Sequence, residues 1–113
     1  MRERHLISLE EAIRQLTLVP ARLYGIRDRG VLAEGAWADV VVFDPATVGP
    51  GPERTRNDLP GGAPRLYADA RGVEHVLVNG TELVRGGELT GALPGRLLRS
   101  GHDTRTVSAR GPE

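Results

Sequence analysis

The sequence predicts a mainly β protein with an N-terminal helical lead-in. Helical periodicity is confined to the first 25 residues, whereas the run Val40–Phe43 is β-branched and aromatic, as in a short buried strand. Asn79-Gly80 separates two further apolar runs and is a strong hairpin signal. The 15 glycines and 8 prolines make the remainder rich in turns.

Three regions follow from this pattern. Residues 1–25 form the helical segment, residues 26–99 form a partial β-sandwich that contains a long loop over 44–72, and residues 100–113 form a flexible tail. With 113 residues the chain is one domain or less, and a domain of this size has a modest core.

The first helix is predicted to begin at Leu9. Ser8-Leu-Glu-Glu11 is a capping-box pattern, in which the Ser8 hydroxyl accepts from the Glu11 N–H. Glu10 and Arg14 have the spacing of an ion pair on the polar face. An apolar stripe with helical spacing needs a partner surface, and it consists of Leu9, Ala12, Ile13 and Leu16.

A second, shorter helix is predicted around Pro20, which suits a first helical turn. Leu23 and Tyr24 are expected to face inward. Gly25 is expected to end the helix with a positive φ.

The β region is predicted to open with a tight turn at Asp28–Gly30 and a brief strand at Val31–Leu32. A turn at Ala33–Gly35 then leads to the strand Val40–Phe43. From residue 44 to residue 71 prolines and glycines replace any periodicity, so this stretch is predicted to be a long surface loop.

The hairpin is the firmest local prediction. Val73–Val78 and Thr81–Val84 are its strands, and Asn79-Gly80 supplies two residues that tolerate positive φ. Another turn is expected at Arg85–Glu88, and Leu97-Leu98 is expected to add a short edge strand.

Composition excludes several functions. Fifteen acidic residues balance fifteen basic ones, so no field draws the chain to nucleic acid or to an anionic membrane. Every basic residue is an arginine, which rules out a lysine base, and the lack of cysteine rules out thiolate chemistry. Without a secretory signal or an apolar run of membrane-spanning length, a cytoplasmic location is expected.

No catalytic, cofactor-binding or metal-binding residue is predicted. The three histidines lack the spacing of metal ligands. His75 and its neighbour Glu74 point to opposite faces of the predicted strand, which argues against a histidine–glutamate pair that could act as a general base. The carboxylates that lie near turns are expected to bond their own backbone. These candidates, each interpreted as structural, are His5, His75, His102, Asp39, Asp44, Asp58 and Asp69.

Several segments in combination resemble the C-terminal part of amidohydrolase-superfamily enzymes, and among these the N-acyl-D-amino-acid deacylases (D-aminoacylases). The resemblance covers about Arg2 to Val107. It is carried by Ser8–Thr17, Pro20–Gly25, Arg29–Gly35, Ala38–Pro45, Asp58–Ala63, Arg65–Tyr67, Val76–Gly80 and Gly87–Arg96.

The resemblance implies a metal-dependent hydrolase that cleaves linear C–N amide bonds and converts an N-acyl-D-amino acid to a D-amino acid and a carboxylate. It implies an (αβ)₈ barrel with a zinc site and a composite β-sandwich, to which 8–18 would add a barrel-associated helix and 31–98 a share of the sandwich. The metal ligands of the family lie on the barrel, which this chain lacks, so the chain alone is expected to be inactive and to hold no cofactor.

Three interpretations remain open at this stage. The chain could complement a separate barrel portion of the enzyme, with its apolar stripe as interface. It could instead be a non-catalytic β-module that forms a homodimer across its open strand edges. It could also be a truncated gene product of marginal stability. Arg65 and Tyr67 are the loop residues to mutate first, with loop anchoring as the favoured role.

Overall fold

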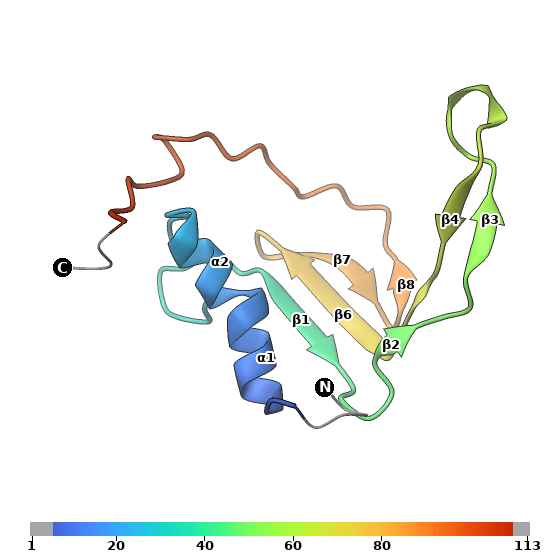
Figure 1. The fold of residues 1–113 in the computed structure, drawn as a ribbon, viewed down its shortest axis with the longest axis horizontal. Coiled ribbons are helices and arrows are strands. Elements are labelled where there is room, and N and C mark those ends of the chain that lie inside the picture. Colours follow the sequence, from blue (N-terminus) through green and yellow to red (C-terminus); the bar gives the residue numbers. More distant parts are fainter. Residues whose placement is uncertain (1–5, 110–113) are drawn as a thin grey trace.

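The computed structural model describes residues 6–109 and confirms a mainly β fold with an N-terminal helical part (Figure 1). Helices α1 (Leu9–Leu16) and α2 (Leu18–Leu23) are consecutive and meet at Thr17. A 3₁₀ turn, η1, spans Pro60–Gly62. All strand pairs are antiparallel, and the strands are β1 (Val40–Phe43), β2 (Gly49–Pro50), β3 (Arg54–Arg56), β4 (Arg65–Tyr67), β5 (Ala70–Arg71), β6 (Val73–Val78), β7 (Thr81–Arg85) and β8 (Glu88–Leu89).

Helix α1 begins where the capping pattern predicts. The Ser8 hydroxyl accepts from the Glu11 N–H at 3.2 Å. The predicted pair between Glu10 and Arg14 does not form, because Arg14 makes a bidentate contact to Glu11 one turn before it, at 2.8 and 2.9 Å. The same Glu11 carboxylate also accepts from the Gln15 side-chain amide at 2.8 Å.

Helix α2 differs from the prediction in its orientation. Ala21 is the buried side chain of this helix, whereas Leu23 and Tyr24 are 65% and 69% exposed, so the expectation that they face inward is wrong. The smaller side chain is buried because the loop at Gly30 passes directly over Ala21. Gly25 follows the helix with φ +64°, as expected of a residue that ends it.

A four-stranded sheet in the order β1-β6-β7-β8 is the centre of the fold. Both tight turns of this sheet use two residues with positive φ, Asn79-Gly80 between β6 and β7 and Gly86-Gly87 between β7 and β8. This geometry matches the right-handed twist of the strands, which is why the hairpin prediction is confirmed. β1 lies at the edge of the sheet in this chain.

Two predicted strands do not form. Val31–Leu32 lies between the positive-φ residue Gly30 and the turn at 33–36, which leaves too few residues for pairing. Leu97–Leu98 belongs to an extended segment without strand pairing. In both cases a short apolar dipeptide has the composition of a strand. Neither dipeptide has a neighbouring strand in the described residues with which it could form backbone hydrogen bonds.

The stretch 44–72 is more ordered than the predicted loop. It contains two short ladders, β2 with β5 and β3 with β4, and together they form the protruding arm of Figure 1. The pairs are nested: β1 with β6 lies outermost, β2 with β5 follows, and β3 with β4 is innermost. Residues 40–78 are thus one long interrupted hairpin, whose strands were too short to show a period in the sequence.

A polar cluster joins the loop before β1 to the β6–β7 turn. Asp39 accepts from the Arg29 guanidinium at 2.5 Å and from the Asn79 N–H at 2.9 Å. Asn79 in turn accepts from Arg29 and donates to the Pro94 carbonyl, each by its side-chain amide. This Arg29–Asp39–Asn79 cluster fixes the end of the sheet against the C-terminal segment.

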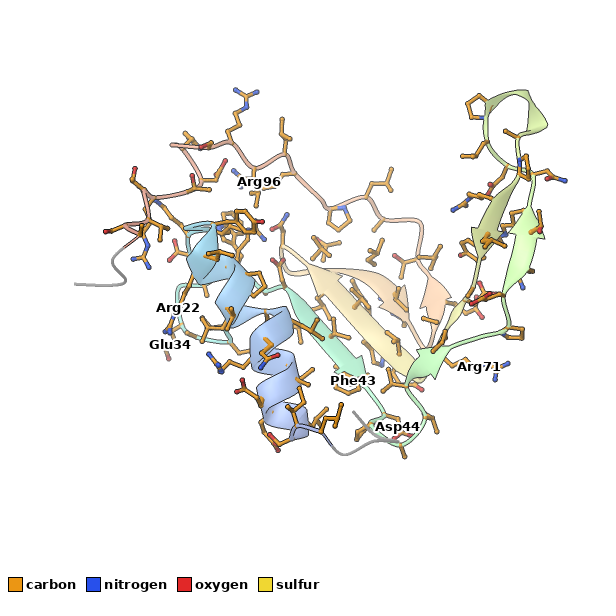
Figure 2. The ribbon with its side chains drawn as sticks, viewed as in Figure 1. Arg22, Glu34, Phe43, Asp44, Arg71 and Arg96 are labelled. Atoms are coloured by element: carbon orange, nitrogen blue, oxygen red, sulfur yellow. The ribbon has the colours of Figure 1, made fainter. Side chains whose placement is uncertain are left out.

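Trp37 lies against the same cluster. Its ring is contacted by the guanidiniums of Arg29 and Arg96, whose central carbons lie 5.0 and 4.8 Å from the ring centroid. Figure 2 shows Arg96 on the C-terminal segment, which runs past the end of α2. Cation–π contacts of this kind hold an extended segment that has no ladder of its own.

The segment after residue 98 returns to the helical region. Ile26 and Thr104 form an isolated antiparallel β-bridge. The Arg27 N–H donates to the backbone carbonyl of Asp103, and the Arg105 N–H donates to that of Gly25. Of the predicted flexible tail, residues 110–113 lie outside the described residues, and the flexibility of 100–109 stays a prediction.

Very little apolar surface is buried. Ala21 is the single buried hydrophobic side chain in residues 6–109. In β1, Val41 is 54% and Val42 48% exposed, whereas Val40 and Phe43 are partly buried. Because neighbours in a strand point to opposite faces, each face of this strand is only partly covered. On α1, Leu16 is 75% exposed. The apolar surfaces that the sequence patterns into a helix and a strand have no covering layer among the described residues.

Gly30 offers a first test of the fold. Its φ is +86°, and an added Cβ would lie 2.7 Å from the Ala21 Cβ and 3.0 Å from the Thr17 carbonyl oxygen. Gly30→Ala should lower the free energy of unfolding by about 2–4 kcal/mol, from left-handed strain and overpacking together. Gly35→Ala is the matched control, because Gly35 has φ +80° with nothing within 4 Å, and it should lose only about 1–2 kcal/mol. Equal losses in urea unfolding would contradict the close packing at Gly30.

Asp39 offers a second test. Burial acts to raise the pKa of Asp39, but the hydrogen bonds from Asn79 and Arg29 outweigh it and lower the pKa below its usual value. A lowered folded-state pKa stabilises the fold above the unfolded value of about 3.9, and this contribution is lost as the pH falls through the folded value. Asp39→Asn should therefore cost roughly 1–2 kcal/mol at pH 7 and progressively less below about pH 4.

Thermal unfolding of both proteins by circular dichroism, from pH 7 to pH 2, measures this difference directly. The comparison removes the effect of the other carboxylates, which titrate in both proteins. A difference that stays constant across this range would show that the charge of Asp39 does not support the sheet.

Candidate functional site

The carboxylates near turns are held by basic side chains or by their own backbone. Asp44 accepts from the Ala46 N–H at 2.8 Å, as predicted for an aspartate at a turn. Asp58 is bound by Arg65 through two hydrogen bonds, of 2.6 and 2.7 Å, and Asp69 pairs with Arg54 at 2.7 Å. The prediction that Asp58 and Asp69 bond their own turns missed these partners, because the opposing arginines come from strands that the sequence did not reveal.

These contacts do not favour acid catalysis. Arg65 holds the pKa of Asp58 below its usual value, and Asp39 is likewise lowered. A general acid at neutral pH needs a raised pKa, so that it carries a proton to donate. The Asp39 and Asp58 carboxylates are charged at neutral pH and serve as hydrogen-bond acceptors.

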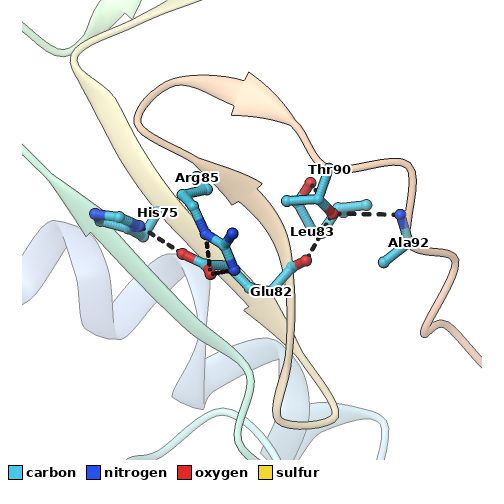
Figure 3. A network of polar contacts seen from close by, with 6 residues as sticks. All are labelled: His75, Glu82, Leu83, Arg85, Thr90 and Ala92. Atoms are coloured by element: carbon cyan, nitrogen blue, oxygen red, sulfur yellow. Dashed lines mark hydrogen bonds and ion pairs between the residues drawn. The ribbon is translucent and has the colours of Figure 1, made fainter.

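His75 is paired with a different glutamate from its sequence neighbour. Its Nδ1 lies 2.7 Å from Oε1 of Glu82, on the next strand, and Arg85 donates to the other oxygen of that carboxylate (Figure 3). Glu74 is exposed on the opposite face, as the alternation of the strand predicts. Arg85, and then His75, lower the pKa of Glu82.

A histidine oriented by a carboxylate can act as a base, but it needs a group to activate. The hydroxyl of the network in Figure 3 is that of Thr90, which donates to the Glu82 carbonyl at 2.8 Å and accepts from the Ala92 N–H at 3.3 Å. This hydroxyl holds the extended segment after β8 against β7. The network therefore locks the β6–β7–β8 unit and offers no nucleophile to His75.

The other histidines have separate surroundings. His102 is exposed and lies 3.2 Å from Asp103 through its Nδ1. His5 lies outside the described residues. Within residues 6–109 no three His, Cys, Asp or Glu side chains are grouped so that they could hold a metal ion. The residues described here do not fit the zinc that the family resemblance implies, and no chemical step of this chain is derived through it.

The arm carries the strongest concentration of charge around an aromatic ring. Tyr67 is contacted by the guanidiniums of Arg54, Arg56 and Arg65, whose central carbons lie 5.5, 3.9 and 5.0 Å from the ring centroid. The sequence singled out Arg65 and Tyr67 but not the two arginines of β3, which come from what looked like an irregular loop. The pairing of β3 with β4 is the signal that was missing.

One open apolar recess lies beside the sheet. It is lined by Val78, Leu83, Leu93, Pro94 and Gly95, and its volume is about 280 Å³. Its lining carries no charged side chain, and no titratable group opens into it.

Neither α1 nor α2 has the length and apolar character needed to cross a bilayer, and they are the only α-helices in residues 6–109.

Comparison with known proteins gives these features a family. Residues 1–84 match the Amidohydrolase family. The chain is 46% identical over 99 residues to N-acyl-D-glutamate deacylase and 40% identical over 102 residues to N-acyl-D-aspartate deacylase, both of Alcaligenes xylosoxydans xylosoxydans. D-aminoacylase of the same organism is 35% identical over 97 residues.

These matches cover 88%, 89% and 86% of this chain, and 18% of each relative. The chain thus spans less than a fifth of the length of the curated relatives that it matches. No solved structure matches it. The family match covers residues 1–84, and the three relatives are 35–46% identical to the chain. The resemblance seen in the sequence motifs is therefore confirmed: the chain belongs to the Amidohydrolase family.

Proposed function

We propose that this chain is the β-rich portion of a metal-dependent hydrolase that acts on linear amides, and that it does its work by docking on a larger catalytic portion. The reaction would be the deacylation of an N-acyl-D-amino acid to a D-amino acid and a carboxylate. The names of the three relatives support this substrate class, since two are deacylases of N-acyl-D-amino acids and the third is a D-aminoacylase.

The observation that carries the proposal is the uncovered apolar surface. Leu16 of α1 and Val41 and Val42 of β1 are exposed, although the sequence gives α1 an amphipathic pattern and β1 the composition of a buried strand. Such surfaces are stable in water only at a cost of roughly 25 cal/mol per Å² of apolar area. A larger protein that covers them recovers that energy on assembly.

The catalytic groups would come from the larger portion. In residues 6–109 the Asp39, Asp58 and Glu82 carboxylates are each paired with a basic side chain, and no three His, Cys, Asp or Glu side chains are grouped to hold a metal ion. The contribution of this chain is therefore structural: it presents apolar faces for docking and holds its arm in place. The chain alone should not deacylate an N-acyl-D-amino acid.

A second candidate function is self-association without catalysis. The exposed edge of β1 and its open faces would allow a second copy to cover them, as unpaired sheet edges commonly do. The two functions differ in the partner: the hydrolase portion requires a larger chain, whereas the module requires only itself.

Complementation tests the first function. The chain would be mixed with an N-acyl-D-glutamate deacylase from which the matching segment has been removed, and hydrolysis of N-acetyl-D-glutamate would be followed. We expect activity only in the mixture, with the two chains co-eluting. Hydrolysis by the zinc-loaded chain alone, abolished by chelation, would overturn the prediction. A discrete homodimer that does not bind the larger chain would favour the second function.

Leu16→Asp locates the docking surface. Since Leu16 is 75% exposed in the chain itself, the substitution should leave the unfolding midpoint of the free chain nearly unchanged while lowering complementation at least tenfold. Gln15→Asp, on the polar face of the same helix, adds the same charge and is the control that should complement normally. Equal complementation by the two variants would exclude the α1 stripe from the interface.

A further inference from the structure

The arm places four side chains on one face of a two-stranded ladder. Arg54 and Arg56 are two apart in β3, and Arg65 and Tyr67 are two apart in β4, so each pair shares a face. The register sets Arg54 opposite Tyr67 and Arg56 opposite Arg65. Thr55 and Leu66 are the residues of the other face. The result is three guanidiniums gathered over one tyrosine ring.

Two of these arginines are neutralised within the arm. Arg65 binds Asp58 in a bidentate contact, and Arg54 pairs with Asp69. Arg56 makes no direct ion pair among the described residues, although it adds to the lowering of the Asp58 pKa that Arg65 dominates. Arg56 lies directly opposite Arg65, and the single carboxylate of Asp58 compensates these two like charges only in part.

Arg56 is nevertheless held in place. Its guanidinium carbon lies 3.9 Å from the centroid of the Tyr67 ring, the shortest of the three contacts, and the residue is half-buried. A stacked guanidinium keeps its N–H groups in a planar fork at its edges, which is the geometry that a carboxylate binds. Little side-chain entropy remains to be lost when an anion binds.

We propose that this face of the arm, made by Arg54, Arg56, Arg65 and Tyr67, is a binding site for a small dicarboxylate. One carboxylate would bind the free fork of Arg56. The second would lie near Arg54 or Arg65, whose ion pairs with Asp69 and Asp58 are about half exposed, so that a ligand carboxylate can compete for these guanidiniums. The arm projects away from the sheet (Figure 1), so the face is accessible in the free chain.

The class of ligand connects the arm with the reaction. N-acyl derivatives of D-glutamate and D-aspartate are themselves small dicarboxylates, and two of the relatives are named for them. Use of the site in substrate selection rests on the proposed function. Binding of a dicarboxylate to the arm does not, because it depends only on residues of this chain.

The experiment is a titration of the ¹⁵N-labelled 113-residue chain with glutarate, followed by the arginine Nε–Hε signals in NMR. We expect a dissociation constant on the order of 1–10 mM, as for an exposed charged site. The Arg56 signal should shift most. N-acetyl-D-glutamate should bind similarly, and N-acetyl-D-alanine, with one carboxylate, at least tenfold more weakly.

Three variants sharpen the test. Arg56→Gln should weaken binding of glutarate at least tenfold. Arg56→Lys keeps the charge but loses the planar fork and the stacking, and it should weaken binding more than threefold. Arg22→Gln is the control and should bind as the original chain does. Arg22 is exposed on α2, at the opposite end of the molecule from the arm (Figure 2).

Several results would overturn the proposal. One is an equal loss of glutarate binding in Arg56→Gln and Arg22→Gln. Another is an equal affinity for the mono- and dicarboxylates. The third is that an acidic peptide binds the chain while glutarate does not. If Arg56→Gln perturbs the arm, the shift of Arg56 in the unsubstituted chain decides the matter. Failure of complementation with the larger chain leaves these binding results unchanged, so the two proposals fail separately.

Discussion

The contact of Asp39 with Arg29 and Asn79 is the interaction on which the rest of the sheet depends. It joins the loop that leads into β1, the turn that closes β6 and β7, and, through Asn79, the segment at Pro94. Asn79 holds a positive φ that only a few residue types tolerate, and its side chain is bonded on both sides. Without this cluster, the edge strand and the hairpin would be joined by backbone pairing alone.

A cluster of this kind matters more here than in an ordinary domain. Most small domains are held by a hydrophobic core, whereas only one hydrophobic side chain is buried in residues 6–109. Backbone ladders, tight turns and exposed ion pairs determine the shape, and each exposed pair contributes little by itself. The apolar surface that would normally stabilise the fold is present but faces outward. The proposed docking on a larger portion would supply the covering layer that the described residues lack.

Local signals in the sequence predicted local structure well. The capping pattern at Ser8, the strand Val40–Phe43 and the Asn79-Gly80 turn are each decided by neighbours within a few residues, and all three are confirmed. The orientation of Leu23 and the absence of pairing at Val31–Leu32 depend on what lies across the fold, which no periodicity records. The same holds for the site. Arg65 and Tyr67 were visible as loop residues, but Arg54 and Arg56 were not, because three-residue strands have no detectable period.

The nested ladders bear on how the chain finds its fold. Pairing β1 with β6 directly would close a loop of about thirty residues, at an entropic cost that grows with the logarithm of loop length. The turn at Pro60–Gly62 instead allows β3 and β4 to meet across a short connection, after which β2 with β5 and then β1 with β6 each close only a few additional residues. The arm thereby allows a route of successive short loop closures, in which the strands pair in order from the tip toward the sheet. Each of these closures costs less conformational entropy than the direct pairing of β1 with β6.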